Sequence, residues 1–444
     1  MPTLALVRRY GSLSPVPALV ADLRYRGLLH AVTDPALLER LDHGQVTVYA
    51  GFDPTAPSLH VGNLLQLCTL RRLQLSGHRP LALAGGGTGM IGDPGGRSGE
   101  RALLSAEELE ANLAGISAQL ASFLDFSEGA GPARAVLLDN AAWLGPLSMV
   151  DFLRDVGKHF TVNQMVAKES VKARFERPDQ GISYTEFSYM LLQAYDFLRL
   201  HLDHGCDAQL GGSDQWGNIT MGVELVRKVA RHEVFGLTTP LVTRADGTKF
   251  GKSEGGNDRV WLDPAMTSPY RLYQFLFNSE DQVVGDYLRY FTFLSHEELE
   301  ELDLATAGDA RHRRAQRALA RQVVALVHGE HEVARAERAA GALFSEEIAA
   351  LDEATLLDVV EDAPTTELGR QALLDGLSLV DALALTGLAS SKSDARRQVA
   401  QGGVSVNNVK VLDPERVLTV GDLLHDRYLV LRRGPRNQHL LSVR

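Results

Sequence analysis

Two lysines separated by two residues stand in a glycine-rich stretch of the chain. Lys249 and Lys252 lie in the segment RADGTKFGKSEGG. Ammonium groups on such a loop can close over a polyphosphate and stabilise the charge of a leaving pyrophosphate. The spacing of a phosphate-binding P-loop would require glycine at position 246, where the chain has Asp246. The segment therefore predicts a polyphosphate site of another kind, with a solvated basic turn as the alternative.

A second group of residues stands where a strand and a turn give way to a helix pattern. His60, Gly62 and Asn63 occur there in the order HVGN. The first turn of a helix has free backbone N–H groups and the positive end of the helix dipole, which together attract anions. A histidine adds a donor for phosphate oxygens, and a glycine lets a flat base lie against the backbone. These residues predict a nucleotide site, and an ordinary helix cap is the alternative.

A polar stripe is predicted on one face of a helix in FSYMLLQAYDFLRL. Tyr189, Gln193 and Asp196 are spaced i, i+4 and i+7, so all three lie on the same face. Apolar residues occupy the other sides, which indicates that the stripe does more than face water. Buried polar groups need partners, and either a small polar ligand or an internal hydrogen-bond network can supply them.

Glycines gather in GGGTGMIGDPGG, residues 85–96. Three of them match the spacing of the dinucleotide-binding fingerprint after a predicted strand. Pro94 would stop the helix that the fingerprint must open, and no acid-ended strand follows about 20 residues later. The stretch instead predicts a substrate-lining loop in which Thr88 and Asp93 present polar groups to a ligand.

The segments that must position these residues alternate between strand and helix patterns. Strands are predicted at 46–52, 79–84, 135–138, 207–212 and 241–243, and helices at 61–76, 148–157, 184–199 and 215–230. This alternation predicts an α/β fold with a Rossmann-like parallel sheet covered on both faces. Residues 269–344 are rich in Ala, Leu, Glu and Arg at helical spacing, which predicts a helical domain.

The net charge of −11 conceals a change of sign near the C-terminus. Residues 345–368 hold eight acidic residues and no Lys or Arg, whereas 388–444 hold ten Lys or Arg against five Asp or Glu. Such a change marks a domain boundary. The predicted domains are an N-terminal extension at 1–34, the Rossmann-like catalytic domain at 35–247, the lysine-bearing loop with a helical domain at 248–345, an acidic linker at 346–372 and a small α+β domain at 373–444.

Composition excludes several classes of protein. With 45% hydrophobic and 23% charged residues the chain resembles an ordinary globular protein, and no window approaches the roughly 18 apolar residues of a membrane span. Two cysteines, Cys68 and Cys206, cannot form a disulfide framework or a four-ligand zinc site, which favours a reducing compartment and a cytoplasmic location. Residues 1–24 lack the apolar core of a secretory signal, although an organelle address is an alternative. The negative charge argues against non-specific coating of nucleic acid.

Taken in order, these motifs resemble those of the class I aminoacyl-tRNA synthetases. His60–Asn63 is similar to the HIGH element and Lys249–Ser253 to the KMSKS loop, and a helical domain follows the second motif. The blocks YAGFDPTAPSLHVGN, GMIGDPGGRSGER, TEFSYMLLQAYDF, GGSDQWGN and ADGTKFGKS look like those of the bacterial-type tyrosyl-tRNA synthetase family. The likeness runs from about Tyr49 to the C-terminus, where residues 373–444 are similar to an S4-type RNA-binding domain.

The resemblance implies a two-step reaction. L-Tyrosine would react with ATP to give tyrosyl-adenylate and pyrophosphate, and tyrosine would then pass to the 3′ end of tRNA(Tyr). Such an enzyme needs no protein nucleophile, since it positions the reactants and stabilises charge. The resemblance also implies Mg²⁺ on the ATP phosphates without a dedicated protein metal site, and a homodimer with no membrane partner.

The resemblance assigns a role to each matching residue. The phenol hydroxyl of tyrosine would be bound by Tyr49 and Asp196. The rest of the tyrosine would contact Thr88, Asp93, Tyr189, Gln193 and Gln215, with Asp93, Tyr189 and Gln193 at its amino group. The adenylate would lie against Gly51, Asp53, Gly62, Gly212 and Asp214. ATP would face Thr55, His60 and Asn63, and its phosphates would be held by Arg97, Arg101, Lys249 and Lys252.

Three positions depart from the family pattern. Asn63 stands where the second histidine of HIGH often occurs, and its amide can still donate a hydrogen bond. Phe250-Gly251 replaces Met-Ser, a variation common in this branch. Arg97 stands where lysine is usual, which keeps the charge but changes its geometry.

Three other functions are compatible with parts of this pattern. A synthetase for tryptophan would not need the predicted phenol-binding pair Tyr49 and Asp196. A non-catalytic RNA-binding protein with a relict synthetase fold would not be expected to keep Lys249 and Lys252. A nucleotidyltransferase with a similar helix start would not explain an RNA-binding tail.

Overall fold

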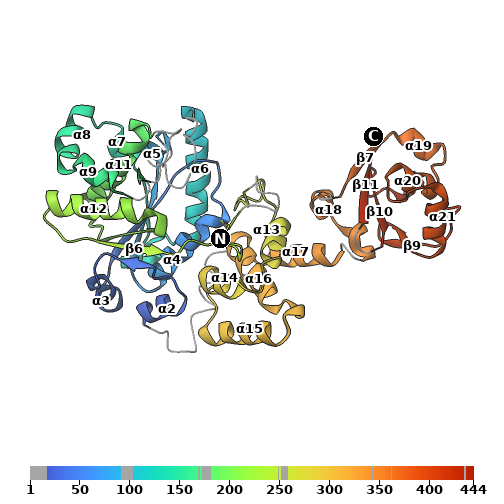
Figure 1. Cartoon of the computed structure of the whole chain (residues 1–444), viewed down its shortest axis with the longest axis horizontal. Helices are drawn as coiled ribbons and strands as arrows, with labels where there is room; N and C mark the ends of the chain where they lie inside the picture. Colours follow the sequence, from blue (N-terminus) through green and yellow to red (C-terminus); the bar gives the residue numbers. More distant parts are fainter. Residues whose placement is uncertain are drawn as a thin grey trace. The chain divides into compact units, whose positions relative to one another are not determined.

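The computed structural model describes residues 18–91, 104–168, 171–172, 182–248, 250–251, 259–342, 345–361, 363–434 and 437–444. The chain divides into two compact units (Figure 1). The first comprises Met1–Thr267 with Phe275–Val327, and the second comprises Ser268–Gln274 with His328–Arg444. No helix in the described part of the chain is long and apolar enough to cross a membrane.

The first unit is built on a sheet that has six strands among the described residues, in the order β1-β6-β5-β2-β3-β4. The strands are β1 (Ala31–Val32), β2 (Thr47–Phe52), β3 (Arg79–Ala84), β4 (Val136–Asp139), β5 (Ala208–Gly212) and β6 (Phe235–Thr239). Neighbours from β6 to β4 pair in parallel, and β1 is antiparallel at one edge. This is a doubly wound order, and its direction reverses between β2 and β5. The predicted Rossmann-like parallel sheet is confirmed.

Helices cover the sheet on both sides (Figure 1). Helix α4 (Leu64–Leu75) packs on β2, β3 and β5, whereas α12 (Trp216–Val229) packs on β5 and β6 and against α11 (Tyr184–His204). The other helices of this region are α2 (Leu19–Tyr25), α3 (Ala36–His43), α5 (Gly86–Gly89), α6 (Ala106–Phe123), α7 (Ala141–Leu144), α8 (Met149–Asp155) and α9 (Val162–Val166). Helix α11 begins at Ser183, whose side chain accepts from the Glu186 N–H, and ends at the left-handed Gly205.

One predicted strand is wrong. The last parallel strand is β6, whereas residues 241–243 lie outside the sheet and Leu241 is exposed. The sequence of β6, FGLTT, is not a continuous apolar run, although all five residues are buried and Thr238 and Thr239 are hydrogen-bonded. Pro240 has no N–H with which to extend the ladder, so the strand ends before the predicted segment.

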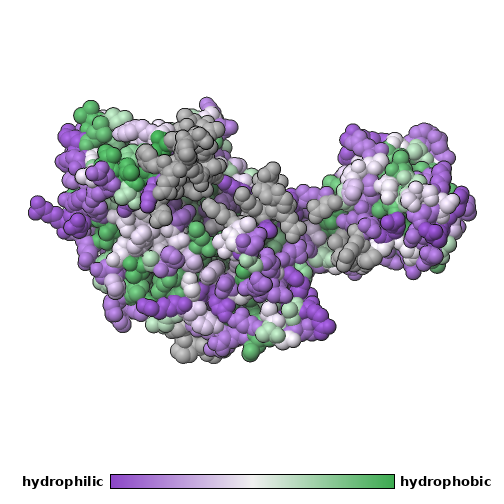
Figure 2. Space-filling model, in the orientation of Figure 1, coloured by the Kyte–Doolittle hydropathy of each residue, from purple (hydrophilic) through white to green (hydrophobic). Residues whose placement is uncertain are grey.

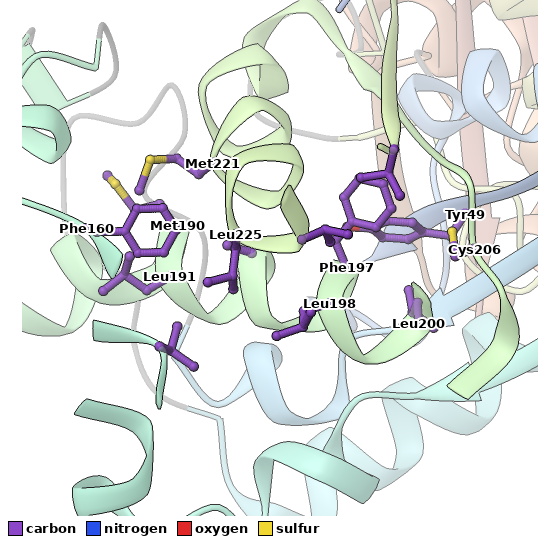
Figure 3. Packing of buried hydrophobic residues seen from close by; sticks show 14 of the residues in the cluster. Tyr49, Phe160, Met190, Leu191, Phe197, Leu198, Leu200, Cys206, Met221 and Leu225 are labelled. Atoms are coloured by element: carbon purple, nitrogen blue, oxygen red, sulfur yellow. The ribbon is translucent and has the colours of Figure 1, made fainter. Parts of the chain in front are cut away.

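The core beneath α11 and α12 contains the first predicted ligand-binding residue. Figure 3 shows Tyr49 beside Phe197 and Cys206, in the same apolar cluster as Met190 and Leu225. The rings of Tyr49 and Phe197 meet edge to face with their centroids 5.2 Å apart. Tyr49 is 1% exposed, so its phenol is buried in this core.

The helical part of the first unit follows the lysine-bearing loop in the chain. It consists of α14 (Val284–Phe291), α15 (His296–Asp309) and α16 (Arg314–His328), with α13 (Pro269–Phe277) shared between the two units. Helix α14 is strongly amphipathic and buries Val284, Tyr287, Leu288 and Phe291. Its packing against α4 therefore brings the helical region onto the helix that follows the HVGN motif.

The second unit contains a five-stranded sheet, counted over the described residues, in the order β7-β11-β10-β8-β9. The strands are β7 (Thr365–Leu368), β8 (Val404–Val406), β9 (Val409–Val411), β10 (Tyr428–Arg433) and β11 (Asn437–Val443). The helices are α17 (Glu330–Ala342), α18 (Glu353–Val359), α19 (Arg370–Leu374), α20 (Leu379–Leu385) and α21 (Lys392–Ala400). The two short helices followed by strands after Gly402 and Gly403 are as predicted.

Alternate residues of β10 face opposite sides of this sheet. Leu429 and Leu431 join one cluster with α20 and α21, whereas Tyr428 and Val430 join another with Leu356 of α18. The acidic segment after α17 therefore packs on the C-terminal sheet, and β7 adds a parallel strand to it.

Candidate active site

The carboxyl ends of β2 and β5 meet where the strand order reverses. In doubly wound sheets this is where ligands bind. Gly51 lies near the end of β2, and nothing is within 4 Å of the position that a Cβ would occupy there. Gly212 ends β5, and a Cβ on it would lie 2.6 Å from Oδ1 of Asp214. The backbone is therefore accessible at Gly51, whereas at Gly212 the carboxylate of Asp214 lies close to it.

A hydrogen-bond network joins four predicted residues, and Asn140, which was not predicted, at this edge. The Tyr189 hydroxyl donates to Oδ2 of Asp53 at 2.8 Å, and the Thr88 hydroxyl donates to the other oxygen at 3.0 Å. Nδ2 of Asn140 lies 3.0 Å from both Oγ1 of Thr88 and Oδ2 of Asp196. Folding therefore connects the end of β2, the glycine-rich turn, the end of β4 and the polar face of α11.

The carboxylate of Asp196 is held at both oxygens. Trp143 donates from its indole N–H to Oδ1 at 2.7 Å, and Asn140 donates to Oδ2. Burial raises the pKa of Asp196 to about 7, although these two hydrogen bonds favour the charged form; the nearby Asp53 raises the pKa further. A buried carboxyl that changes charge near neutral pH is typical of a functional site.

The hydroxyl of Tyr49 is buried and has no hydrogen-bond partner among the described residues. Burial, with a contribution from the charge of Asp196, raises the pKa of this phenol well above its usual value. A buried polar group without a partner is destabilising, so such groups in native proteins need an explanation. A ligand hydroxyl bound between Tyr49 and Asp196 would supply the missing partner.

Three amides form a second polar group beside α11. Asn218 donates to Oε1 of Gln193 at 2.9 Å and to Oε1 of Gln215 at 3.1 Å. Gln193 comes from the polar stripe of α11, and the other two follow β5 in the block GGSDQWGN. Asp214, in the same block, is exposed. The stripe residues are thus partnered inside the protein and lie beside the strand end where a ligand would bind.

The HVGN motif forms a helix cap. Nδ1 of His60 accepts from the Gly62 N–H at 3.0 Å, and Oδ1 of Asn63 accepts from the His60 N–H at 3.0 Å. The short helix η1 (Val61–Asn63) then leads into α4. A Cβ on residue 62 would lie 2.7 Å from Cε1 of His60, so glycine is required for this close approach. The cap interpretation is correct as local structure: the Gly62 and Asn63 N–H groups donate to His60, and the Val61 N–H donates to the Val260 carbonyl.

The glycine cluster is explained by close approach to two carboxylates. A Cβ on Gly85 would lie 2.3 Å from Oδ1 of Asp53, and one on Gly86 would lie 2.3 Å from Oδ1 of Asp139. The Gly86 N–H also donates to Asp139 at 3.1 Å. Thr88 is buried and hydrogen-bonds to Asp53 and Asn140, so it helps to orient these two side chains.

Several predicted residues lie outside the described part of the chain: Asp93, Arg97, Arg101, Lys249 and Lys252. Of the remaining ones, Thr55 follows β2 in a turn in which its N–H donates to the Asp53 carbonyl at 2.9 Å. Phe250 and Gly251 of the second motif are described, and Gly251 lies against η1, because its Cβ position is 3.0 Å from Cγ2 of Val61. The lysine-bearing motif and the histidine-bearing HVGN motif are therefore neighbours in space.

Sequence reasoning missed the residues that orient Asp196. Asn140 and Trp143 stand in LLDNAAW, and Asn218 stands in the block GGSDQWGN. The available signal was position, since Asp139 and Asn140 come directly at the end of a predicted strand. Polar residues at the carboxyl end of a parallel strand face the ligand-binding edge.

Comparison with known proteins relates both units to one group of enzymes. A model of the tRNA synthetases class I (W and Y) matches residues 41–345, and a model of the tyrosine–tRNA ligase SYY-like C-terminal domain matches residues 356–441. The tyrosine–tRNA ligase of Roseiflexus castenholzii is 55% identical over 423 residues, covering 95% of this chain and 98% of the relative. That of Mycobacterium tuberculosis is 52% identical over 418 residues, covering 94% and 96%.

A solved structure shares the fold as well. The C-terminally truncated mitochondrial tyrosyl-tRNA synthetase of Aspergillus nidulans is 34% identical, with a TM-score of 0.66, and the match covers 77% of this chain and 97% of that one.

Proposed function

The chain belongs to the tyrosine–tRNA ligase family of class I tRNA synthetases, and from that premise we propose which of its residues perform the reaction. It activates L-tyrosine with ATP and transfers it to tRNA(Tyr). The observation that carries the residue assignment is the buried hydroxyl of Tyr49, which has no hydrogen-bond partner among the described residues, together with the nearby carboxylate of Asp196, which is hydrogen-bonded at both oxygens.

Tyr49 and Asp196 bind the phenol hydroxyl of the substrate. The phenol O–H donates to the Asp196 carboxylate, and the Tyr49 hydroxyl gains the partner that it lacks among the described residues. Phenylalanine would leave both groups unpaired in a buried site, and rejection of phenylalanine by tyrosyl-tRNA synthetases is the standard example of such discrimination. Asn140 and Trp143 hold Asp196 in place without contacting the substrate.

The amino acid end of the substrate lies toward β2 and β5. Tyr189, Gln193 and Asp93 bind the amino group, and Gln215 lies beside the carboxylate. The hydrogen bond from Tyr189 to Asp53 supports this placement, since it sets a negative charge next to the position of an ammonium group. Thr88 fixes the other oxygen of Asp53 and so orients it.

ATP lies between the helix start and the ends of the two strands. The adenylate is flanked by Gly51, Asp53, Gly62, Gly212 and Asp214. ATP is faced by Thr55, His60 and Asn63. Its phosphates are held by Arg97, Arg101, Lys249 and Lys252. The Cβ position of Gly251 lies 3.0 Å from Cγ2 of Val61, which supports one ATP site shared by the two motifs. The accessible strand end at Gly51 supports a flat ligand lying on bare backbone.

The reaction needs positioning and charge. The tyrosine carboxylate attacks the α-phosphorus, the bond to the bridging oxygen of pyrophosphate breaks, and the cationic side chains stabilise the leaving group. A ribose hydroxyl of the tRNA then attacks the carbonyl carbon of the adenylate, and AMP leaves. Mg²⁺ would accompany the ATP phosphates, because it is usually bound through substrate phosphates and one or two carboxylates.

The C-terminal domain, residues 373–444, binds tRNA. Its supporting feature is a net charge of +5 over residues 388–444, from ten basic and five acidic residues. Arg396 and Arg397 of α21 and Lys410 of β9 are exposed. Phosphate contacts of this kind give affinity that falls steeply with salt.

The enzyme is a cytoplasmic homodimer. β4 is an edge strand among the described residues, and exposed apolar side chains occur on it and on the following helices α8 and α9: Leu137, Met149, Val150, Leu153 and Val162. Figure 2 shows hydrophobic surface over α8, where three of these residues lie. Apolar groups collected on an edge of this kind fit the same surface of a second copy.

The test of the overall assignment is ATP–pyrophosphate exchange with each proteinogenic amino acid in turn. Tyrosine should support exchange far better than any other amino acid, and purified tRNA(Tyr) should then be charged with it. Exchange driven best by tryptophan would contradict the assignment of Tyr49 and Asp196.

A further inference from the structure

Phe250 of the second motif is inserted into a cluster of aromatic rings on the helical region. Its ring centroid is 4.6 Å from that of Tyr287, 5.2 Å from Phe275 and 5.4 Å from Phe291, and it is 8% exposed. Tyr287 and Phe291 are on the buried face of α14. Aromatic contacts at these separations add to the free energy gained by burying the rings.

The backbone that leads into the motif is tied to the same helix. The Tyr287 hydroxyl donates to the carbonyl of Thr243 at 2.7 Å. The Phe250 N–H donates to the carbonyl of Val242 at 3.1 Å, which closes the base of the intervening segment. Helix α14 therefore holds this segment at two points: by a ring contact at Phe250 and by a hydrogen bond at Thr243.

The other side of the motif is tied to the helix start that carries His60. The Val260 N–H donates to the Gly251 carbonyl at 3.1 Å, and the Val61 N–H donates to the Val260 carbonyl at 3.0 Å. Gly251 has φ 95°, and its Cβ position lies 3.0 Å from Cγ2 of Val61. A side chain at residue 251 would be strained and would crowd the helix start.

The end of α14 also contacts the helix that continues from that start. The Cys68 thiol of α4 donates to the Phe291 carbonyl at 3.7 Å, and Arg72 of α4 donates to the carbonyl of Thr292. The Arg72 guanidinium lies 4.5 Å from the ring centroid of Phe293. One end of one helix thus contacts both the body of α4 and the aromatic side chain of the second motif.

We propose that α14 is a brace that sets the position of Phe250–Gly251 relative to His60–Asn63, with Tyr287 and Phe250 as positioning residues for adenylate formation. Neither residue is proposed to touch the reacting atoms. The inference rests on the proposed binding of ATP by the two motifs. Misplacement of a charged group by a fraction of an ångström lowers the rate of a reaction that depends on positioning, while the binding of tyrosine elsewhere in the site is unaffected.

The decisive comparison uses two tyrosines of α14. Tyr287→Phe removes only the hydroxyl that bonds Thr243, whereas Tyr290→Phe removes a hydroxyl on the side of Gly27. Single-turnover adenylate formation should slow roughly 2- to 12-fold in Tyr287→Phe, the range for loss of one hydrogen bond, with tyrosine affinity unchanged. Tyr290→Phe should react like the unmodified enzyme. Equal rates in all three proteins, or a loss of tyrosine affinity that accounts for the slower rate, would overturn the proposal.

A second pair of variants tests the ring contact. Phe250→Leu should slow adenylate formation, and Phe250→Met, which keeps a long apolar side chain, should restore most of the rate. Thermal unfolding identifies a variant that is merely unstable, since such a variant loses folded enzyme without changing the rate per folded site. If Lys252→Ala left the rate of adenylate formation unchanged, the proposed role of the motif in catalysis would be wrong. If Lys252→Ala were slow while Tyr287→Phe and Phe250→Leu reacted at the normal rate, only the proposed role of α14 would be wrong.

Discussion

The indole N–H of Trp143 and the side-chain amide of Asn140 donate hydrogen bonds to the two oxygens of one buried carboxylate, Asp196, at 2.7 Å and 3.0 Å. Both donors come from the segment at the end of β4, whereas Asp196 comes from the middle of α11. The donors favour the charged form, yet burial is the larger effect and raises the pKa to about 7. The same group is therefore expected to influence stability, its pH dependence and the choice of substrate.

Asp196 should make the free protein less stable as the pH rises toward neutrality. Its pKa is raised from 3.8 to about 7 in the folded state, so over this interval the folded protein binds more protons than the unfolded chain. The free energy of unfolding then falls with pH, by at most about 1.4 kcal/mol per pH unit for one group. Urea unfolding from pH 5 to 8 should show a smaller slope in Asp196→Asn than in the unmodified protein. The exposed Asp203→Asn on the same helix is the control, and identical slopes in all three proteins would refute the assignment.

Tyr49→Phe should separate stability from specificity. The substitution removes a buried hydroxyl that lacks a partner in the described structure, so the free protein should be as stable as before or more stable by up to about 1 kcal/mol. The ratio of kcat/KM for tyrosine over phenylalanine in pyrophosphate exchange should fall, because the phenol loses one of its two partners. An unchanged ratio would mean that Tyr49 does not bind the phenol hydroxyl of the substrate.

Lys252→Ala should slow adenylate formation while tyrosine affinity stays the same. A charge that acts on the developing pyrophosphate contributes mainly in the transition state, and loss of one such interaction raises the barrier by roughly 3–4 kcal/mol. Rapid-quench measurement of adenylate formation alongside equilibrium tyrosine binding checks this. Lys158→Ala, an exposed lysine of the same unit, controls for the change in net charge. Weaker tyrosine binding at an unchanged rate would argue against a role on the phosphates.

The RNA-binding role of the C-terminal domain is best tested by charge. Truncation at Gly369 would strip β10 and β11 from the buried side chains of Ile348 and Leu356, so it would also damage the part that remains. Arg396→Ala and Lys410→Ala should instead raise the KM for tRNA and leave pyrophosphate exchange unchanged. Each lost phosphate contact should reduce the slope of log affinity against log salt by about 1. Normal tRNA affinity and an unchanged slope in the double variant would exclude a role for these two side chains in tRNA binding.

A charge on the exposed apolar surface of α8 should separate the proposed dimer. Val150 is 72% exposed on α8, and Leu304 is 73% exposed on α15. Val150→Glu should lower the molar mass measured by sedimentation equilibrium toward that of one chain, whereas Leu304→Glu should not. A dimer that persists at micromolar concentration in Val150→Glu would place the interface elsewhere.

The sequence by itself determined the fold class and the family. The strands 79–84 and 207–212 and the helix from 184 were predictable because apolar patterns act over a few residues. The ordered motifs, from YAGFDPTAPSLHVGN to ADGTKFGKS, likewise need no structure to be recognised. β6 was not predictable in this way, since its buried threonines satisfy their hydroxyls through Ala31 and Gly211, in other strands.

Only the tertiary structure decided how the candidate site is assembled. Asp53, Thr88, Asn140 and Asp196 are far apart in the chain, and they meet because parallel strands bring their carboxyl ends to one edge of the sheet. Whether the polar stripe of α11 faces a ligand or an internal network likewise depends on residues such as Asn218 that approach it from another helix. The pKa of Asp196 depends on burial by the whole core. Hydrogen bonding and desolvation are set by neighbours in space, and no pattern along the chain contains them.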